Sequence, residues 1–454
     1  MKGDFSRDTF DPLKHFSRVL LQQGRVQLDA DTNEQTAILL HYLRTLVTDL
    51  IGSHAGPNDN SGFLIDNPSK KDFSIGKGRY YVAGILCEND TDITYKTQKD
   101  YPHPPELEED VPYLVYLDVW ERHITALEDD YIREKALGGP DTATRTKVIC
   151  QVKVDKGEEG LSPSDCVTVS NNWKEKWINR WQPANRGSLK ACVTPQKDSK
   201  DPCLIAPDSR YRGQENQLYR IEIHKGSKGD KAGEPNSATF KWSRDNGAVV
   251  SKVLEFSGKE LTVEKTLGFE PKIWVELSND DQELRGEPGS LAKLVNVEGN
   301  RFILESAILR PAGISTNEEW PTKVRRWDQR YNSNLIEGAI PITEDKADWI
   351  EIENGIEIQF VAADTGEDSH HYRTGDFWLI SARVATGDIE WVEIDEDGKP
   401  KDEKNPIARE LFGIQHHYAP LAILNMGQSE PPDCRCKFEP LKNDCDRSGT
   451  RKKA

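Results

Sequence analysis

Near the start of the chain, apolar side chains recur at the spacing of a helix. Four leucines alternate four and three residues apart, namely Leu39, Leu43, Leu46 and Leu50. This spacing aligns them along one helical face. Asp31 offers a side-chain oxygen to the first turn, and Gly52 is a residue that commonly ends a helix. The sequence therefore predicts an amphipathic helix over residues 31–51, within an N-terminal attachment segment at 1–56.

The leucine stripe needs an apolar partner, and two kinds of partner fit it. The stripe covers about two heptads, which excludes a long coiled coil. A short bundle of several copies of the chain would bury it. Packing against the protein's own domains would bury it equally well, and the spacing alone does not choose between these interpretations.

Beyond the helix, the apolar positions form short runs rich in β-branched and aromatic residues, separated by turns that contain Gly, Pro, Asn or Asp. Such runs predict strands. The strands and the linkers between them divide the chain into five further parts. These are a small β domain at 57–112, a β-rich domain with an irregular Trp-rich insert at 113–235, a small barrel-like domain at 236–320, a C-terminal β domain at 321–427 and a flexible tail at 428–454.

Two Asn-Gly pairs predict the tightest turns. Asn354-Gly355 divides an alternating run into two strands, and Asn246-Gly247, preceded by Asp245, separates the runs 238–244 and 249–254. Both central residues of a two-residue hairpin turn take positive φ, which Asn and Gly tolerate best. Each pair therefore predicts a β-hairpin.

The composition agrees with many short strands. The chain of 454 residues has 33 Gly, 25 Pro and 11 Trp but only 2 Met, a balance that suits strands and turns better than stacked helices. The length exceeds one ordinary core. We expect a mainly β, multi-domain protein, in which an N-terminal helix for oligomerisation is followed by small β-sandwich or β-barrel domains.

The net charge of −17 limits the classes of partner. The chain has no surplus of Lys and Arg to neutralise phosphates, so we expect no nucleic-acid partner. No apolar run approaches the roughly 18 residues of a membrane span, so no membrane insertion is expected. The charged start does not resemble a signal peptide, which indicates synthesis in the cytoplasm without export by that route.

Two histidine pairs are the strongest candidates for metal ligands. They are His370-His371 and His416-His417. Neighbouring residues on a strand point to opposite sides, so one member of each pair would face inward. Histidines beside Tyr and Trp are more often core or turn residues, and that interpretation ranks above metal binding. Asn279-Asp280-Asp281 is a weaker candidate for calcium, in a loop where acidic residues also favour solubility.

No Walker loop, dinucleotide-binding glycine motif, nucleophile elbow or HExxH motif occurs in the sequence. No such motif indicates a cofactor, and we predict none.

A Trp-rich stretch supplies a candidate contact surface. Trp173, Trp177 and Trp181 follow one another at intervals of four residues. On a helix they would share one face. That face suits the core, a contact with a partner, or a platform for sugars, and the first two are favoured.

The eight cysteines do not show the paired spacing of a zinc site. Cys87, Cys150 and Cys166 are most simply buried apolar residues. Cys192 and Cys203 flank a polar loop that a disulfide or a metal would close, while Cys434, Cys436 and Cys445 lie near the C-terminus. For a protein made in the cytoplasm, free thiols are the favoured interpretation.

Five segments carry a resemblance to a known family. They are MKGDFSRDTFDPLKHFSRVLLQQGRVQLDADTNEQ, WERHITALEDDYIREKALGGPDTATRTKVICQVKV, ENQLYRIEIH, FKWSRDNGAVV and YRTGDFWLISARVATGDIEW. From Met1 to about Pro440 the chain resembles a family of largely uncharacterised proteins encoded with phage-tail-like contractile injection systems. The stretch from Gln23 through the helix to the strand near Gly84 is also similar to the N-terminal modules of phage tail-fibre and baseplate proteins, which attach as trimers.

These resemblances imply a non-enzymatic structural component of a contractile tail-like particle, which would be released or anchored with that particle. No fibre shaft or receptor-binding tip follows Pro440, which favours a baseplate-peripheral part or a fibre adaptor. The implied partners are the chain itself, as a homotrimer, and other tail or baseplate proteins. The alternative is a carbohydrate-binding adhesin or polysaccharide hydrolase that uses the Trp-rich region and the acidic loops.

Overall fold

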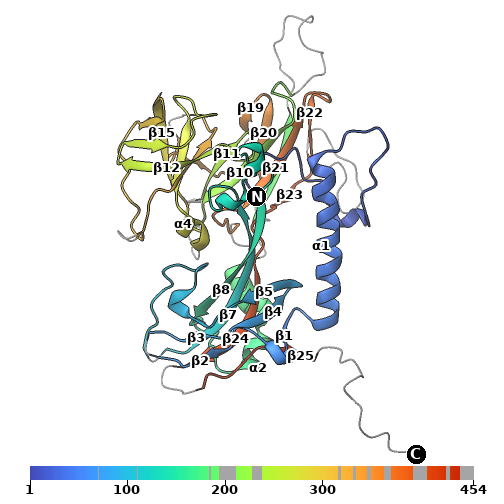
Figure 1. Cartoon of the computed structure of the whole chain (residues 1–454), viewed down its shortest axis with the longest axis vertical. Coiled ribbons are helices and arrows are strands. Elements are labelled where there is room, and N and C mark those ends of the chain that lie inside the picture. The colour runs from blue at the N-terminus through green and yellow to red at the C-terminus, as the bar shows by residue number, and fades with distance from the viewer. Residues whose placement is uncertain are drawn as a thin grey trace, which may run out of the picture.

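The computed structural model describes residues 1–69, 71–109, 111–183, 186–193, 211–227, 238–314, 318–330, 334–344, 349–361, 370–391, 406–425 and 430–439. These residues form two lobes, with one long helix running beside both of them (Figure 1). The fold is mainly β, as the sequence predicts, and it includes an N-terminal helix and a closed barrel.

The long helix, α1, spans Asp29–Ile51. The Asp31 carboxylate accepts a hydrogen bond from the Leu28 N–H at 3.1 Å, and Gly52 ends the helix at a φ of 88°. Both ends therefore follow the signals in the sequence.

The lower lobe of Figure 1 is built around two of the longest strands in the chain. Tyr113–Ile124 (β7) pairs with Arg145–Asp155 (β8) along its whole length and with His417–Leu424 (β24) on its other side. The almost unbroken apolar run of β7 is explained by its central position, because both of its faces are covered.

Two small sheets complete the lower lobe. One has the order β25-β1-β4-β5 and the other the order β2-β3-β6. Their strands are β1 (His54–Pro57), β2 (Ile65–Asp66), β3 (Ser74–Ile75), β4 (Gly78–Val82), β5 (Ile85–Asn89), β6 (Ile93–Thr94) and β25 (Lys437–Phe438). Their inward side chains share one apolar core with β7, β8 and β24.

The upper lobe contains a sandwich of two sheets, with the orders β18-β11-β10-β21-β22 and β19-β20-β9-β23. The strands are β9 (Ser188–Val193), β10 (Gln217–Lys225), β11 (Thr239–Ser243), β18 (Ile340–Pro341), β19 (Ile350–Glu353), β20 (Ile356–Phe360), β21 (Phe377–Arg383), β22 (Asp388–Glu390) and β23 (Arg409–Glu410). Apolar side chains from both sheets form a single core between them.

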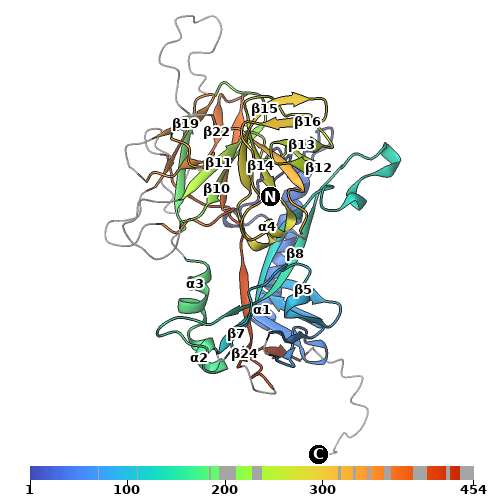
Figure 2. The ribbon, with the colours of Figure 1, turned by 90° about the vertical axis from the view of Figure 1, so that its left-hand side faces the viewer.

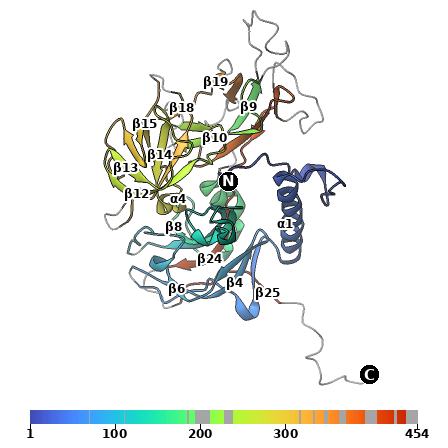
Figure 3. The same cartoon turned by 45° about the horizontal axis from the view of Figure 1, so that its top comes forward.

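A six-stranded closed barrel is inserted into the sandwich and lies beside it (Figures 1 and 3). Its strands are β12 (Val250–Ser257), β13 (Glu260–Val263), β14 (Trp274–Ser278), β15 (Ser290–Glu298), β16 (Arg301–Leu304) and β17 (Lys323–Trp327). Closure leaves the barrel without a free edge, and it encloses its own apolar core.

Short helices fill the connections. They are α2 (Cys166–Asn171), a π-helix (Trp173–Ile178), α3 (Asn179–Trp181), α4 (Asp280–Arg285) and five 3₁₀ turns at Pro12–Lys14, Asn58–Asn60, Tyr95–Thr97, Asp130–Ile132 and Lys135–Leu137. Among the described residues, no helix combines the length and the apolar character that crossing a membrane requires.

The lobes do not follow the predicted domain boundaries. The strand β24 was expected in a C-terminal domain at 321–427, yet it pairs with β7 in the lower lobe, and β25 pairs with β1. In Figure 2 the C-terminal strand β24 runs down beside β7. The chain therefore leaves the lower lobe once and returns to it, a long-range pairing that local patterns do not encode.

The disulfide Cys166–Cys434 corrects the expectation that Cys166 is an ordinary buried thiol. It joins α2 to the segment after β24, across a sequence separation of 268 residues. The side chains of Cys87 and Cys150 form a hydrogen bond. This bond, together with burial, raises the pKa of the Cys87 thiol. Cys203 and Cys445 lie outside the described residues.

Replacing Cys434 by Ser is expected to lower the free energy of unfolding by about 2–4 kcal/mol, because the disulfide closes a long loop in the unfolded chain. Thermal unfolding with and without reductant measures the effect. Cys436→Ser is the matched control, because that exposed thiol forms no disulfide. A melting temperature that is the same in reduced and oxidised protein would contradict the prediction.

Candidate functional site

One face of α1 holds the helix to the rest of the protein. Ile38 on this face is only 1% exposed, and the Arg44 guanidinium donates to both oxygens of Glu121 on β7 at 3.1 and 2.7 Å. Gly84, in the turn between β4 and β5, has a φ of 74°, and a Cβ there would lie 2.3 Å from the Arg44 carbonyl oxygen. Glycine at this position therefore lets the backbone of α1 approach the lower lobe.

The opposite face of α1 carries the leucine stripe, and it points to solvent. The exposed fractions are 59% for Leu39, 55% for Leu43, 56% for Leu46 and 72% for Leu50. Figure 3 shows α1 standing beside the lobes rather than between them. Of the two partners that fit the stripe, the protein's own described domains do not supply one.

The apolar exposure continues into the loop before α1. Six large apolar side chains between residue 13 and the start of α1 are exposed: Leu13, Phe16, Leu20, Leu21, Val26 and Leu28. More than half of the large exposed hydrophobic side chains among the described residues lie in residues 1–50. We call residues 13–50 the N-terminal apolar surface. Exposed apolar area of this density is typical of surfaces that contact another molecule.

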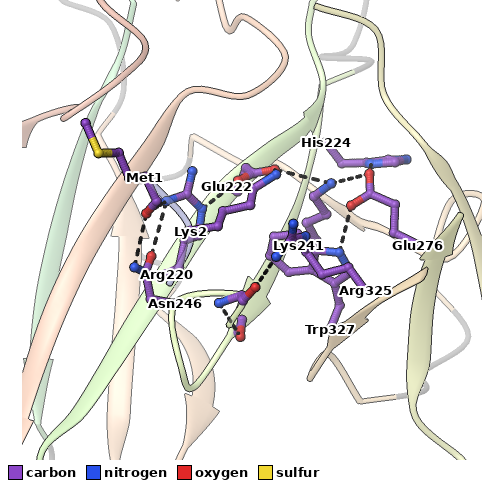
Figure 4. A network of polar contacts seen from close by, with 12 residues as sticks. Met1, Lys2, Arg220, Glu222, His224, Lys241, Asn246, Glu276, Arg325 and Trp327 are labelled. Carbon is purple, nitrogen blue, oxygen red and sulfur yellow. Dashed lines mark hydrogen bonds and ion pairs between the residues drawn. The ribbon is translucent and has the colours of Figure 1, made fainter. Parts of the chain in front are cut away.

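A network of charged residues is buried where the N-terminus, the sandwich and the barrel meet (Figure 4). Lys241 on β11 lies between two carboxylates, with its Nζ 3.3 Å from Glu222 on β10 and 2.5 Å from Glu276 on β14. Its ammonium also lies 4.4 Å from the centre of the Trp327 ring, a favourable cation–π contact. One lysine thus joins the sandwich to the barrel.

The first residues of the chain complete this network. The Lys2 Nζ lies 3.0 Å from Glu222, and the Met1 carbonyl oxygen accepts hydrogen bonds from Arg220 at 3.1 Å and from Asn246 at 3.0 Å. Asn246 also donates to the Gly3 carbonyl oxygen. These contacts fix the start of the chain against both parts of the upper lobe.

The cationic groups of the network hold its carboxylates in their ionised forms. Burial alone would raise the pKa of Glu276, but the nearby ammonium groups of Lys241 and Lys2 outweigh it and lower that pKa to about 2. Burial, assisted by Lys241, lowers the pKa of His224 to about 3, so this imidazole is neutral at neutral pH. The network is therefore a set of mutually satisfied ions that fixes domain positions, rather than a poised acid–base pair.

Two clusters of side chains have the geometry of cation ligands. Glu128, Asp280 and Glu283 form the first, and the ammonium of Lys323 lies 2.7–3.1 Å from all three. Lysine thus supplies the cation that this cluster needs. The second cluster joins His103, Asp281 and Glu318, with His103 Nε2 3.2 Å from Glu318. The Asn279-Asp280-Asp281 stretch, a weak candidate for calcium, caps and begins α4, where acidic residues favour the helix dipole.

The structure separates the four candidate histidines by their partners. His370 Nδ1 lies 3.1 Å from Glu344, and His416 Nδ1 lies 2.6 Å from Asp118. The groups of possible metal ligands found among the described residues contain none of His370, His371, His416 and His417. Metal binding by these pairs stays a prediction that the geometry does not favour.

The three tryptophans have unequal exposure. Trp173 and Trp177 are buried, 7% and 1% exposed. Trp181 is partly buried; its ring stacks on Tyr116 at 3.8 Å, and its Nε1 donates to Asp155 at 2.7 Å. The predicted contact surface therefore reduces to Trp181, and the other two rings belong to the core.

A cleft of about 1110 Å³ opens between α3, the end of β8 and the segments after β10 and before β21. Three arginines line it. Arg180 pairs with Asp155 and Arg186 with Asp376, while Arg373 donates to His416 Nε2 at 3.2 Å.

Sequence reasoning missed most of these groups. Asp118 gives the clearest signal in retrospect, because it is a single carboxylate within the apolar run YLVYLDVW. Arg220, Glu222 and Lys241 occupy strands in which charged residues are usually read as solvent-facing. Arg220 and Glu222 pair with one another two residues apart on β10, but their other partners come from distant segments that no local pattern links to them.

The chain belongs to a protein family of unknown function, DUF6519. The model of this family matches residues 1–176 and 178–449. Neither the curated proteins nor the solved structures include a significant match to the chain.

Proposed function

We propose that this protein is a non-enzymatic structural component of a phage-tail-like contractile injection particle, and that it self-associates through residues 31–51. The exposed leucine face of α1 is the observation that carries the proposal. A soluble chain gains free energy by covering such a face, at about 25 cal/mol per Å² of apolar surface removed from water.

The pattern of α1 suits a bundle of three helices. Leu39 and Leu46 fill one core position of the heptad, and Leu43 and Leu50 fill the other. Three of the four flanking positions hold apolar or aromatic residues, Leu40, Tyr42 and Val47, and only the fourth, Asp49, is charged, whereas Glu and Lys usually border a two-stranded seam. Since a wider apolar face needs more than one neighbour to cover it, we propose a homotrimer.

The rest of the N-terminal apolar surface would serve contacts with other tail or baseplate proteins. The loop before α1 displays Phe16, Leu20 and Leu21 beside the helix, and Ser6 N–H and hydroxyl groups bind the Asp29 carboxylate at 2.9 and 2.7 Å. The loop therefore has a fixed start at the head of the helix. The resemblance of this region to tail-fibre and baseplate attachment modules supports a baseplate-peripheral or fibre-adaptor position.

Mass spectrometry of gradient-purified tail-like particles from a native host tests the assignment. We expect the chain to sediment with the particles in a fixed ratio to the sheath protein, and to keep that ratio after a high-salt wash. Absence from intact particles, or a ratio that varies between preparations, would contradict a structural role.

A further inference from the structure

We propose that the cleft beside α3 binds an acidic saccharide, through the Arg373 guanidinium and the Trp181 ring. This binding site is independent of the assembly role proposed above, because the cleft lies on the lobes and not on the N-terminal apolar surface.

Arg373 is held in place by a chain of buried polar groups. Lys153 lies 2.7 Å from Asp118, Asp118 lies 2.6 Å from His416 Nδ1, and His416 Nε2 accepts from Arg373. Asp118 is 2% exposed, and the neighbouring Lys153 and His416 hold the pKa of its carboxyl well below its usual range against the opposing effect of burial. The carboxylate fixes the imidazole so that Nε2 faces the arginine, which orients the guanidinium.

Arg373 differs from the other two arginines of the cleft in its lack of a carboxylate. Arg180 and Arg186 are each paired with an Asp. The Nη1 of Arg373 is buried and has no hydrogen-bond partner, and the partner of Nη2 is a neutral ring nitrogen. A buried guanidinium donor without an acceptor is costly, and an anionic oxygen of a ligand would supply the acceptor.

The other lining groups select a ligand with a single charge and many hydroxyl groups. Glu158, Glu159 and Glu175 line the same cleft together with Lys176 and Lys225, so its charges are mixed in sign and suit a ligand with few charges better than a polyphosphate or another polyanion. The carboxylates accept hydrogen bonds from sugar hydroxyls at the same time. A carboxylated sugar carries one anionic group per ring and offers hydroxyls to the remaining acceptors.

Trp181 supplies a surface for the sugar ring. It lines the cleft, its ring contacts Tyr418 at 5.0 Å, and Tyr418 in turn interacts with Arg373. The Trp181 ring and the Arg373 guanidinium therefore both neighbour one tyrosine. The volume of the cleft accommodates a short oligosaccharide.

Isothermal titration calorimetry of the full chain tests the proposal with two matched pairs of ligands. One pair is a short oligogalacturonate and its methyl ester, and the other is sialyllactose and lactose. We expect millimolar or tighter binding of at least one acid and at least tenfold weaker binding of its neutral counterpart. If no acid binds at millimolar concentration, or if acid and neutral forms bind equally, the proposal is wrong.

Arg373→Gln should weaken binding of that acid at least tenfold, whereas Arg180→Gln, which removes a cleft arginine already paired with carboxylates, should change it less than threefold. Arg373→Lys, which keeps the charge, and Trp181→Leu give independent readouts if Arg373→Gln unfolds. Unchanged affinity in folded Arg373→Gln, or equal losses in it and Arg180→Gln, would overturn the role of Arg373. Neither substitution should alter the native mass, which separates this site from the assembly proposal.

Discussion

Replacing Leu43 and Leu46 together by Asp is expected to convert the native protein to a monomer of 51.4 kDa. Both side chains are more than half exposed in the single chain, so the substitutions remove little intramolecular packing. In a bundle, each Asp would place an unpaired carboxylate in an apolar seam, once for every copy of the helix. Sedimentation equilibrium or light scattering of the wild-type and variant proteins measures the mass.

The matched control is Leu137→Asp with Leu309→Asp. These leucines are 67% and 84% exposed and lie far from α1 in the sequence. They receive the same change in charge and hydrophobicity, so the control variant should keep the oligomeric mass of the wild type. A wild-type protein that is already monomeric, or a mass that survives the Leu43 and Leu46 substitutions, would contradict self-association through α1.

For the helix, the sequence pattern predicts the element and its ends but not which of its faces packs against the protein. The spacing and the end signals predict a helix over residues 31–51, and in the structure α1 spans Asp29–Ile51. Whether its leucines pack against the protein's own core depends on which face of α1 the other contacts turn toward the lobes. Arg44 and Gly84 hold the opposite face against the lower lobe, through an ion pair and a close backbone approach between segments far apart in the chain. Neither contact has a local signature.

The two Asn-Gly pairs also show that a local pattern does not determine which strands pair. At Asn354-Gly355 both residues have positive φ, and β19 pairs with β20 as predicted. At Asn246-Gly247 both φ values are also positive, yet the predicted hairpin is wrong, because β11 pairs with β10 and β18 while β12 pairs with barrel strands. The local turn is right in both cases.

The side chain of Asn246 accounts for the difference between the two turns. It is 1% exposed, accepts from Arg220 and donates to the Met1 and Gly3 carbonyl oxygens. The turn therefore holds the N-terminus at the point where the chain passes from the sandwich into the barrel. Turn chemistry specifies the backbone conformation, whereas long-range polar contacts decide which strands it joins.

The candidate sites were less predictable than the fold for a related reason. Periodicity reports which positions are apolar, and it assigns charged residues in strands to the solvent side. In β10 and β11, Arg220, Glu222 and Lys241 are at most 3% exposed. Buried charges are stable only when they have partners. Here Glu222 pairs with Arg220 and Lys241 within the sandwich, and the remaining partners come from residues 1–2 and from the barrel.

Replacing Glu276 by Gln is expected to lower the free energy of unfolding by about 3–5 kcal/mol, the range measured when one partner of a buried ion pair is removed. Glu276 accepts from Lys241 at 2.5 Å, from Trp327 Nε1 at 2.8 Å and from the Gly289 N–H at 3.1 Å. Glutamine keeps the shape but loses the charge, which leaves the ammonium of Lys241 with Glu222 as its remaining carboxylate. Chemical denaturation monitored by tryptophan fluorescence measures the loss.

Two further variants separate the buried charge from a general effect of the substitution. Glu260→Gln removes a carboxylate from an exposed pair with Arg301 on the same barrel, and it should leave the free energy of unfolding nearly unchanged. Lys241→Met combined with Glu276→Gln removes both buried charges, so the double variant should be more stable than the sum of the single losses implies. Equal losses for Glu276→Gln and Glu260→Gln, or strictly additive effects in the double variant, would show that the pair does not hold the sandwich to the barrel. The position of the barrel relative to the sandwich would then have to rest on apolar contacts and backbone connections alone.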